Sequence, residues 1–339
     1  MIARYHAWSP WRLQVRRALE CASGPRRVGD RGEPESSRAV DGSAHEASRE
    51  VVQRICDASG VVDGPEIIAR SISACAIPDK YGNTWQYHSR SDRHSKIACW
   101  VVAFELMQSC DLLRGHLEHG KVVLGVNHAL RDFQTQRNKK LDLVIGEPAT
   151  SDTSAARRTF ERMGRDVGVV LTVEERAALD RLPAAGEAPV GSVLVALEAK
   201  ACMTAHVRAL PRLHDELDSS HQTTHGNSER ALAGGFVMVN ASETFISSDL
   251  NKFDLSSASP RVSHHRQPSD AMRVIEKVKE IRRRSGTSST GFDAIGVVVV
   301  ELRNDGSPMA LVSSPEPVFP YSQMVQRLAH EYAAAFSRL

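Results

Sequence analysis

The sequence predicts an α/β fold in which helices cover both faces of a mixed central sheet. Short, continuous apolar runs such as 121–127 and 294–302 are typical of buried strands. Segments with an apolar residue every three to four positions, such as 269–284, are typical of amphipathic helices. The two kinds of segment alternate along the second half of the chain, which favours a sheet with helical crossovers.

Length and composition limit the classes of protein to which the chain can belong. Its 339 residues, 41% of them hydrophobic, are enough for one large domain or two ordinary ones with a sizeable core. A formal net charge of +2 means that any nucleic-acid surface is a local patch. The six cysteines form no CxxC pair, which argues against a zinc ribbon. With no membrane-spanning run and no secretory leader, we expect a reducing, cytoplasmic setting and no membrane partner.

The first third of the chain is expected to contain little of the sheet. Residues 1–42 are rich in Arg, Gly, Ser and Pro and are predicted to be a flexible basic tail. An N-terminal helical segment is expected over 43–90. Its first helix opens at the capping box Ser43-x-x-Glu46, and its second at Gly64-Pro65. The main domain is then predicted over 91–339.

The first half of that domain reads as a long helix, a hairpin and an insertion. The helix is expected from Asp92 to about Leu117, with Glu105 inside an otherwise apolar turn. Two apolar runs separated by a polar stretch, 121–127 and 140–146, are expected to pair as a hairpin. Residues 147–190 break the pattern and are interpreted as a helical insertion, with helices near 152–164 and 173–182.

The second half alternates strands and helices. The expected elements are a strand at 192–200, a helix at 204–217, a polar loop at 218–228, a strand at 235–240, an exposed loop at 247–268, a helix at 269–284, strands at 294–302 and 309–312, and a final helix at 321–338. Asn304-Asp305-Gly306 is a hairpin turn signal between the last two strands.

Three charged residues lie on segments predicted to be buried strands. Glu198 and Lys200 close an apolar run and point to the same face, because side chains alternate along a strand. Asp142 stands in the middle of another apolar run. Buried charges are costly unless they are paired or bind an ion. Two carboxylates on neighbouring strands are suited to a hard divalent cation such as Mg²⁺.

These residues resemble the signature of the PD-(D/E)xK nuclease superfamily, which has the restriction-endonuclease-like fold. The pattern reads Leu-Asp142-Leu-Val-Ile and Val-Leu-Val-Ala-Leu-Glu198-Ala-Lys200. The order of elements is also similar: a helix before the first core strand, then a helix and a strand after Glu-x-Lys. Leu141 stands where the motif's proline would be, and the 147–190 insertion has to account for the long spacing between the two acids.

The resemblance implies a metal-dependent endodeoxyribonuclease. Asp142 and Glu198 would be metal ligands for Mg²⁺, with Mn²⁺ as a substitute. Lys200 would orient the attacking water, and Glu105 would be a further acidic catalytic group. A homodimer is expected because cutting both strands suits a symmetric pair. A restriction enzyme, a phage-defence nuclease or the cleavage subunit of a larger defence system would fit.

Cationic side chains near this motif are candidates for contact with the DNA backbone, where cations provide most of the sequence-independent affinity. They are His206, Arg208 and Arg212 on the helix after Glu-x-Lys, and Lys139 and Lys140 before Asp142. A solvated helix face is the competing interpretation for each of them.

Two other functions stay open. A DNA-binding or assembly protein could keep the same fold without cutting. A zinc-dependent hydrolase could use His221-x-x-x-His225, whose spacing suits two ligands on one helix face but lacks the glutamate of HExxH.

Overall fold

The computed structural model describes residues 62–133, 136, 138–150, 158–286, 289–313 and 317–339. Residues Val62–Leu339 form one compact unit, so the segment 62–90 belongs to the same unit as the rest. The predicted basic tail, the predicted helix over 43–58 and the start of the predicted helix over 152–164 lie outside the described residues. Among the described residues, no helix is long and apolar enough to cross a membrane.

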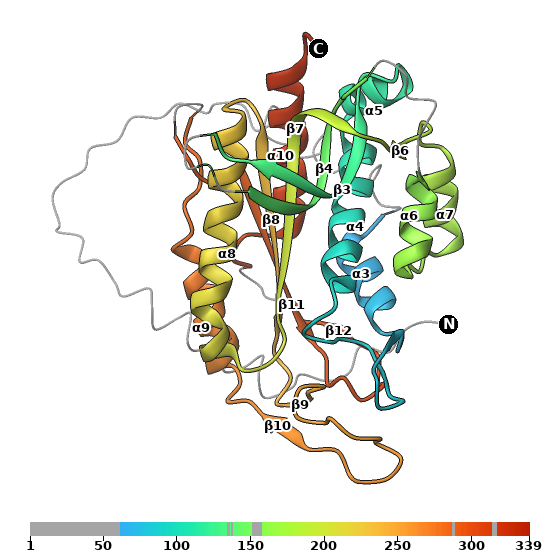
Figure 1. Ribbon diagram of the computed structural model, residues 1–339, viewed down its shortest axis with the longest axis vertical. Helices are drawn as coiled ribbons and strands as arrows, with labels where there is room; N and C mark the ends of the chain where they lie inside the picture. The colour runs from blue at the N-terminus through green and yellow to red at the C-terminus, as the bar shows by residue number, and fades with distance from the viewer. Residues whose placement is uncertain (1–61, 134–135, 137, 151–157, 287–288, 314–316) are drawn as a thin grey trace, which may run out of the picture. The chain divides into compact units, whose positions relative to one another are not determined.

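An eight-stranded mixed sheet runs through this unit (Figure 1). The strands, in their order across the sheet, are β12 (Ala310–Leu311), β11 (Ala294–Glu301), β8 (Leu232–Asn240), β7 (Val190–Cys202), β4 (Asn138–Pro148), β3 (Val123–Arg131), β6 (Gly186–Glu187) and β5 (Arg158–Thr159). β7, β8 and β11 are parallel neighbours, whereas β4 is antiparallel to both β3 and β7. The predicted α/β class with a mixed sheet is therefore confirmed.

Helices cover both faces of the sheet (Figure 1). The long helix α8 (His206–Asn227) and α9 (Ser269–Lys279) pack together on one face. The other face carries α4 (Arg93–Ser109), α10 (Tyr321–Phe336) and α3 (Gly64–Ile72). The main core lies between this second layer and the sheet, where Ile97, Phe104 and Leu328 are fully buried.

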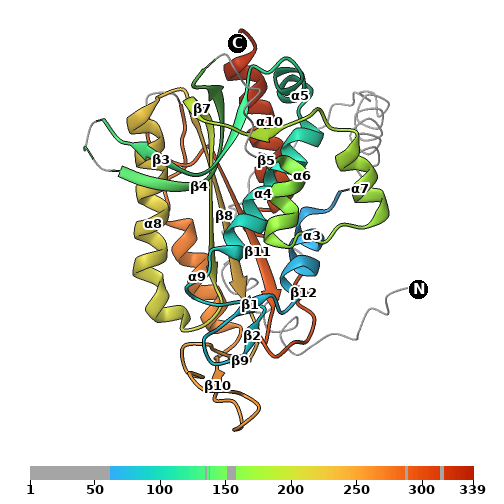
Figure 2. The ribbon, with the colours of Figure 1, turned by 45° about the vertical axis from the view of Figure 1, so that its right-hand side comes forward.

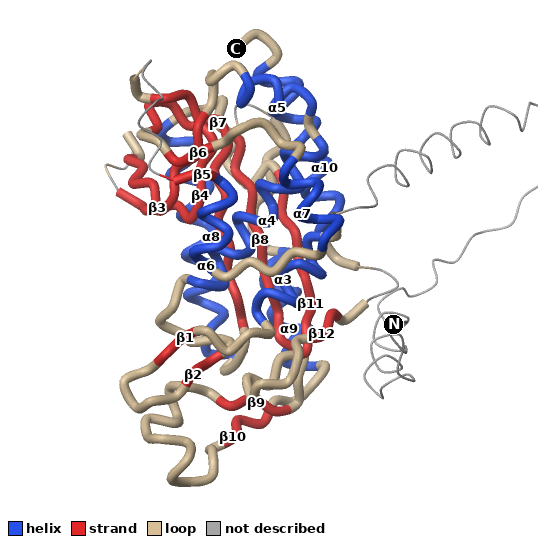
Figure 3. Tube along the Cα trace, turned by 90° about the vertical axis from the view of Figure 1, so that its right-hand side faces the viewer, coloured by secondary structure: helices blue, strands red, loops and turns tan. Residues whose placement is uncertain are grey.

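Two small sheets lie together at one end of the molecule (Figure 3). One pairs β1 (Ile77–Pro78) with β2 (Thr84–Trp85), and the other pairs β9 (Thr244–Ile246) with β10 (Val262–His264). The segments that carry them are joined, because the Asn83 side chain donates to the carbonyl of Phe253 at 2.9 Å. β10 falls in the loop predicted over 247–268, and β1, β2 and β9 lie where no strand was predicted, since strands of two or three residues leave no pattern.

The insertion between Asp142 and Glu198 holds two short helices, although residues 158–159, which were predicted to be helical, form β5 instead. The two helices are α6 (Phe160–Val167) and α7 (Val173–Asp180), and the predicted capping box at Thr172 is present. The predicted helix over 92–117 is in fact two helices. α4 ends at Ser109, Cys110 is extended, and α5 (Asp111–Glu118) follows.

The prediction of a loop over 218–228 is wrong, because α8 continues to Asn227. Ser220, Thr223 and Thr224 suggest a loop by their helix propensity. In the structure these three side chains are buried. The hydroxyls of Ser220 and Thr224 donate to the carbonyls four residues earlier, at 2.8 and 2.9 Å. Burial against the sheet thus outweighs the weak local preference.

The β3–β4 hairpin is longer than predicted and extends beyond its neighbour β7. Its pairing runs from Val123–Gly146 to Arg131–Asn138, whereas the pairing of β4 with β7 stops at Leu143–Leu197. The free end of the hairpin lies beside α8 (Figure 2). The side chain of Asn227 donates to the carbonyl of Arg131 at 3.0 Å. The two strands β4 and β7 begin to diverge at Asp142 and Glu198.

Candidate metal centre

Asp142 lies at the point where β4 separates from β7. The last paired residues are Leu143 and Leu197, so Asp142 and Glu198 are the next residues on the two strands. Beyond this pair a side chain of β4, not its backbone, accepts a hydrogen bond from β7. Asp142 Oδ2 accepts from the Ala199 amide at 3.0 Å. Its Oδ1 accepts from the Ser95 hydroxyl of α4 at 3.2 Å. The strand divergence thus fixes one carboxylate next to Glu-x-Lys.

Glu198 and Lys200 are paired on one face of β7, as alternation predicts. Lys200 Nζ lies 2.7 Å from Glu198 Oε1. The Glu198 side chain is only 3% exposed, and that of Lys200 is 24% exposed. Glu198 Oε2 is buried and has no hydrogen-bond partner in the described part of the chain. A buried carboxylate oxygen without a partner is costly, and a cation would satisfy it.

Two further charged residues reach the same place, and their roles there were not predicted. Lys139 Nζ is 3.8 Å from Glu198 Oε1 and donates to Ser219 Oγ at 2.8 Å and to the carbonyl of Glu216. The Glu216 carboxylate lies 3.1 Å from Lys200 Nζ. The bonds from Lys139 to Ser219 and Glu216 depend on α8 packing over the end of the hairpin, and the contact between Glu216 and Lys200 depends on α8 packing on β7. A sequence pattern cannot show such a long-range contact.

Burial and the mutual charges of this cluster shift its pKa values. Burial raises the pKa of Glu198, and the neighbouring negative charge of Asp142 raises it further. Burial also raises the pKa of Asp142, although the bond from Ala199 opposes this. Burial opposes the charge on both lysines. At Lys200 the negative charges of Glu198 and Asp142 outweigh the effect of burial, and the pKa is raised. At Lys139 the effect of burial prevails, and the pKa is lowered.

The residues present fit a cation with few protein ligands. In the described part of the chain, no group of three or more His, Cys, Asp or Glu side chains is placed to hold a metal ion. Mg²⁺ needs no such group, because proteins bind it through one or two carboxylates plus substrate phosphates and water. Asp142 and Glu198 supply two carboxylates, and the unpartnered Glu198 Oε2 supplies a vacant acceptor.

The structure does not bring Glu105 to this cluster. Its carboxylate accepts from the amide of Gly64 in α3 and lies beside Tyr321 of α10. Ser95 is the α4 residue that contacts Asp142, and Glu105 follows it by ten residues. At a rise of about 1.5 Å per residue, the two lie about 15 Å apart along the helix. The acid of this region whose charge acts on Asp142 is Asp92, just before α4.

The candidate DNA contacts divide into buried and exposed residues. His206 is buried, and its Nε2 lies 2.7 Å from the carbonyl of Asn240, which does not fit the predicted phosphate contact. The side chain of Lys139 points toward Glu198 rather than toward solvent. Arg208 and Lys140 are exposed, and Arg212 is exposed while it pairs with Glu216 at 2.5 Å.

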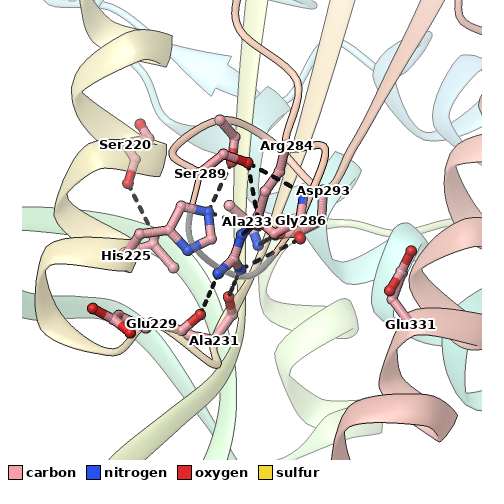
Figure 4. Close-up of polar contacts among 12 residues, drawn as sticks. Ser220, His225, Glu229, Ala231, Ala233, Arg284, Gly286, Ser289, Asp293 and Glu331 are labelled. Carbon is pink, nitrogen blue, oxygen red and sulfur yellow. Dashed lines mark hydrogen bonds and ion pairs between the residues drawn. The ribbon is translucent and has the colours of Figure 1, made fainter.

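His221 and His225 lie on α8 and are held by separate partners. His221 Nε2 is 2.9 Å from Asp218 Oδ1. His225 Nε2 is 2.8 Å from the carbonyl of Gly291, and Figure 4 shows it beside Asp293 and Arg284. Arg284 donates to the carbonyls of Glu229 and Ala231. This network joins the end of α8 to the start of β11, which gives His225 Nε2 a structural role.

Comparison of the chain with family models, curated proteins and solved structures gives no match.

Proposed function

We propose that the protein is a metal-dependent endodeoxyribonuclease whose site is formed by Asp142, Glu198 and Lys200. The observation that carries this proposal is the buried Oε2 of Glu198, which has no hydrogen-bond partner in the described part of the chain and lies on β7 where β4 and β7 separate. The order of elements around the site supports a restriction-endonuclease-like core. A helix precedes the β3–β4 hairpin, and a helix and a parallel strand follow Glu-x-Lys.

Asp142 and Glu198 would hold Mg²⁺, or Mn²⁺ in its place. Such a cation, when bound, lowers the pKa of an attacking water and offsets charge at the phosphate. Lys200 is partly exposed and held between Glu198 and Glu216. Its ammonium group would there orient the attacking water or offset charge at the phosphate. Ser95 and the Ala199 amide hold the Asp142 carboxylate in one orientation.

Exposed cations on two elements would bind the DNA backbone. Arg208 and Arg212 lie on α8, and Lys140 lies on the hairpin. In this proposal the enzyme works as a symmetric dimer that cuts both strands, and defence against phage DNA is its biological setting.

Cleavage of supercoiled plasmid DNA in Mg²⁺ tests the proposal. Wild-type protein is expected to cut, and Glu198→Gln, Asp142→Asn and Lys200→Met are each expected to lose at least about 100-fold in rate. A loss of that size matches the several kcal/mol that a metal centre supplies. Glu147→Gln, which removes another carboxylate from β4, is the matched control and should retain full activity.

Binding of DNA without any cleavage by the wild-type protein would favour the non-cleaving alternative. Cleavage that survives in Glu198→Gln and Asp142→Asn would remove this site from the reaction. Loss of activity in His221→Ala together with bound zinc would instead favour the zinc-hydrolase alternative.

A further inference from the structure

Lys139 is held firmly by α8 in a largely buried position. Its side chain is 17% exposed, and its ammonium group donates to Ser219 Oγ and to the carbonyl of Glu216. Both acceptors are uncharged, so these bonds anchor the ammonium group without neutralising it. A lysine bound in this way is not free to swing out to a distant phosphate.

The charge of Lys139 acts on the same carboxylate oxygen that Lys200 contacts. Lys139 Nζ is 3.8 Å and Lys200 Nζ is 2.7 Å from Glu198 Oε1. The two ammonium groups balance the formal charges of Asp142 and Glu198. Glu216 is balanced in turn by Arg212, which it contacts at 2.5 Å. The cluster is therefore close to neutral before any metal ion enters it.

A neutral site attracts a divalent cation weakly, since Coulomb attraction scales with the charge present and is strong in a poorly solvated site. A phosphodiester that arrives with the cation would restore the negative charge that Lys139 offsets. We propose that Lys139 makes metal binding depend on the substrate, so that the cation and the DNA phosphate bind cooperatively. This inference rests on the proposed metal site at Asp142 and Glu198.

Titration of the full-length protein with Mn²⁺, followed by the electron paramagnetic resonance signal of free Mn²⁺, tests the inference without any cleavage. Wild-type protein is expected to bind Mn²⁺ weakly alone, and at least about tenfold more tightly with a non-cleavable phosphorothioate duplex. Lys139→Met is expected to tighten DNA-free binding about tenfold and to reduce the effect of the duplex.

Matched variants separate this effect from general electrostatics and from damage to the fold. Lys252→Met removes the same charge from an exposed residue between β9 and β10 and should leave DNA-free Mn²⁺ affinity unchanged. Lys139→Arg keeps the charge and should behave as wild type. Lys139→Gln removes the charge but keeps a donor for Ser219, so it should reproduce Lys139→Met even if the methionine variant folds poorly.

Unchanged or weaker DNA-free binding in both Lys139→Met and Lys139→Gln would overturn the inference. An equal gain in Lys252→Met would overturn it too. A gain that survives the addition of Asp142→Asn would also overturn it, because the ion would then bind elsewhere. Failure of the nuclease proposal has a different signature. The wild-type protein would then cut no DNA while the Mn²⁺ affinities still changed with Lys139.

Discussion

At the scale of single residues, Glu105 is a carboxyl that joins three helices. It lies on α4, accepts from the first amide of α3 and lies beside the first residue of α10. Burial raises its pKa from 4.5 to about 7, and the Gly64 amide opposes this only in part. The folded protein therefore holds a proton on Glu105 at a pH where the unfolded chain has released it.

This shift predicts a pH-dependent contribution of Glu105 to stability. Its folded pKa is raised, so the contribution is complete below about pH 4.5 and is lost as the pH rises to about 7. Glu105→Gln stays neutral and should flatten that part of the stability profile. Urea unfolding at pH 5 and pH 8 measures the difference. An identical loss of stability between these pH values in both proteins would contradict the assignment.

The residues of the candidate site were predictable to different degrees. Strand alternation alone was enough to place Glu198 and Lys200 on one face, and the apolar run around Asp142 was enough to place it on another buried strand. The structure places Glu105 against α3 and α10 rather than at Asp142, because its apolar turn indicates burial but not which partner the turn faces. Lys139 was expected to meet DNA because its sequence neighbours are basic. Its contact with Glu198 depends on how far β4 diverges from β7, which no local pattern specifies.

At the scale of elements, Trp100 is the residue by which α4 holds the insertion. Its ring stacks on that of Phe160 with centroids 4.5 Å apart, and its Nε1 donates to the carbonyl of Phe160 at 2.8 Å. A Cβ on Gly164 would lie 2.7 Å from the ring, so α6 approaches it closely. The insertion is thus packed on the core of the fold.

Trp100→Ala is expected to destabilise the protein by about 3–5 kcal/mol, the usual range for a buried aromatic residue. The reason is a cavity at the junction of α4 and α6. Urea unfolding measures the change, and Lys96→Ala, a substitution of a partly exposed residue on the same helix, should change stability by less than about 1 kcal/mol. An equal, small effect of both substitutions would show that the insertion is not anchored at Trp100.

The longer elements were predictable because their apolar periods are strong. β8, β11 and α10 lie close to their expected ranges. The break at Cys110 and the continuation of α8 past residue 217 were missed, since the first is a single extended residue and the second depends on burial of polar side chains.

At the scale of the whole molecule, α8 and β4 carry exposed cations as well as residues of the candidate site, Glu216 and Asp142. Arg208→Ala and Lys140→Ala are each expected to weaken DNA binding and to reduce the slope of log affinity against log salt by about 0.9, the value for one phosphate contact on duplex DNA. Arg165→Ala, on α6 beside the opposite face of the sheet, is the control. Fluorescence anisotropy at several salt concentrations measures the slopes, and equal slopes in all proteins would remove these residues from the interface.

Binding of a divalent cation by Asp142 and Glu198 is the claim on which the proposed nuclease function depends. Its most direct measurement is the anomalous diffraction of crystals grown with Mn²⁺ and a non-cleavable duplex. We predict one peak within direct coordination distance, about 2–2.3 Å, of both an Asp142 oxygen and Glu198 Oε2. A duplex bound at this site with no peak between the two carboxylates, or with Mn²⁺ only at other residues, would contradict it.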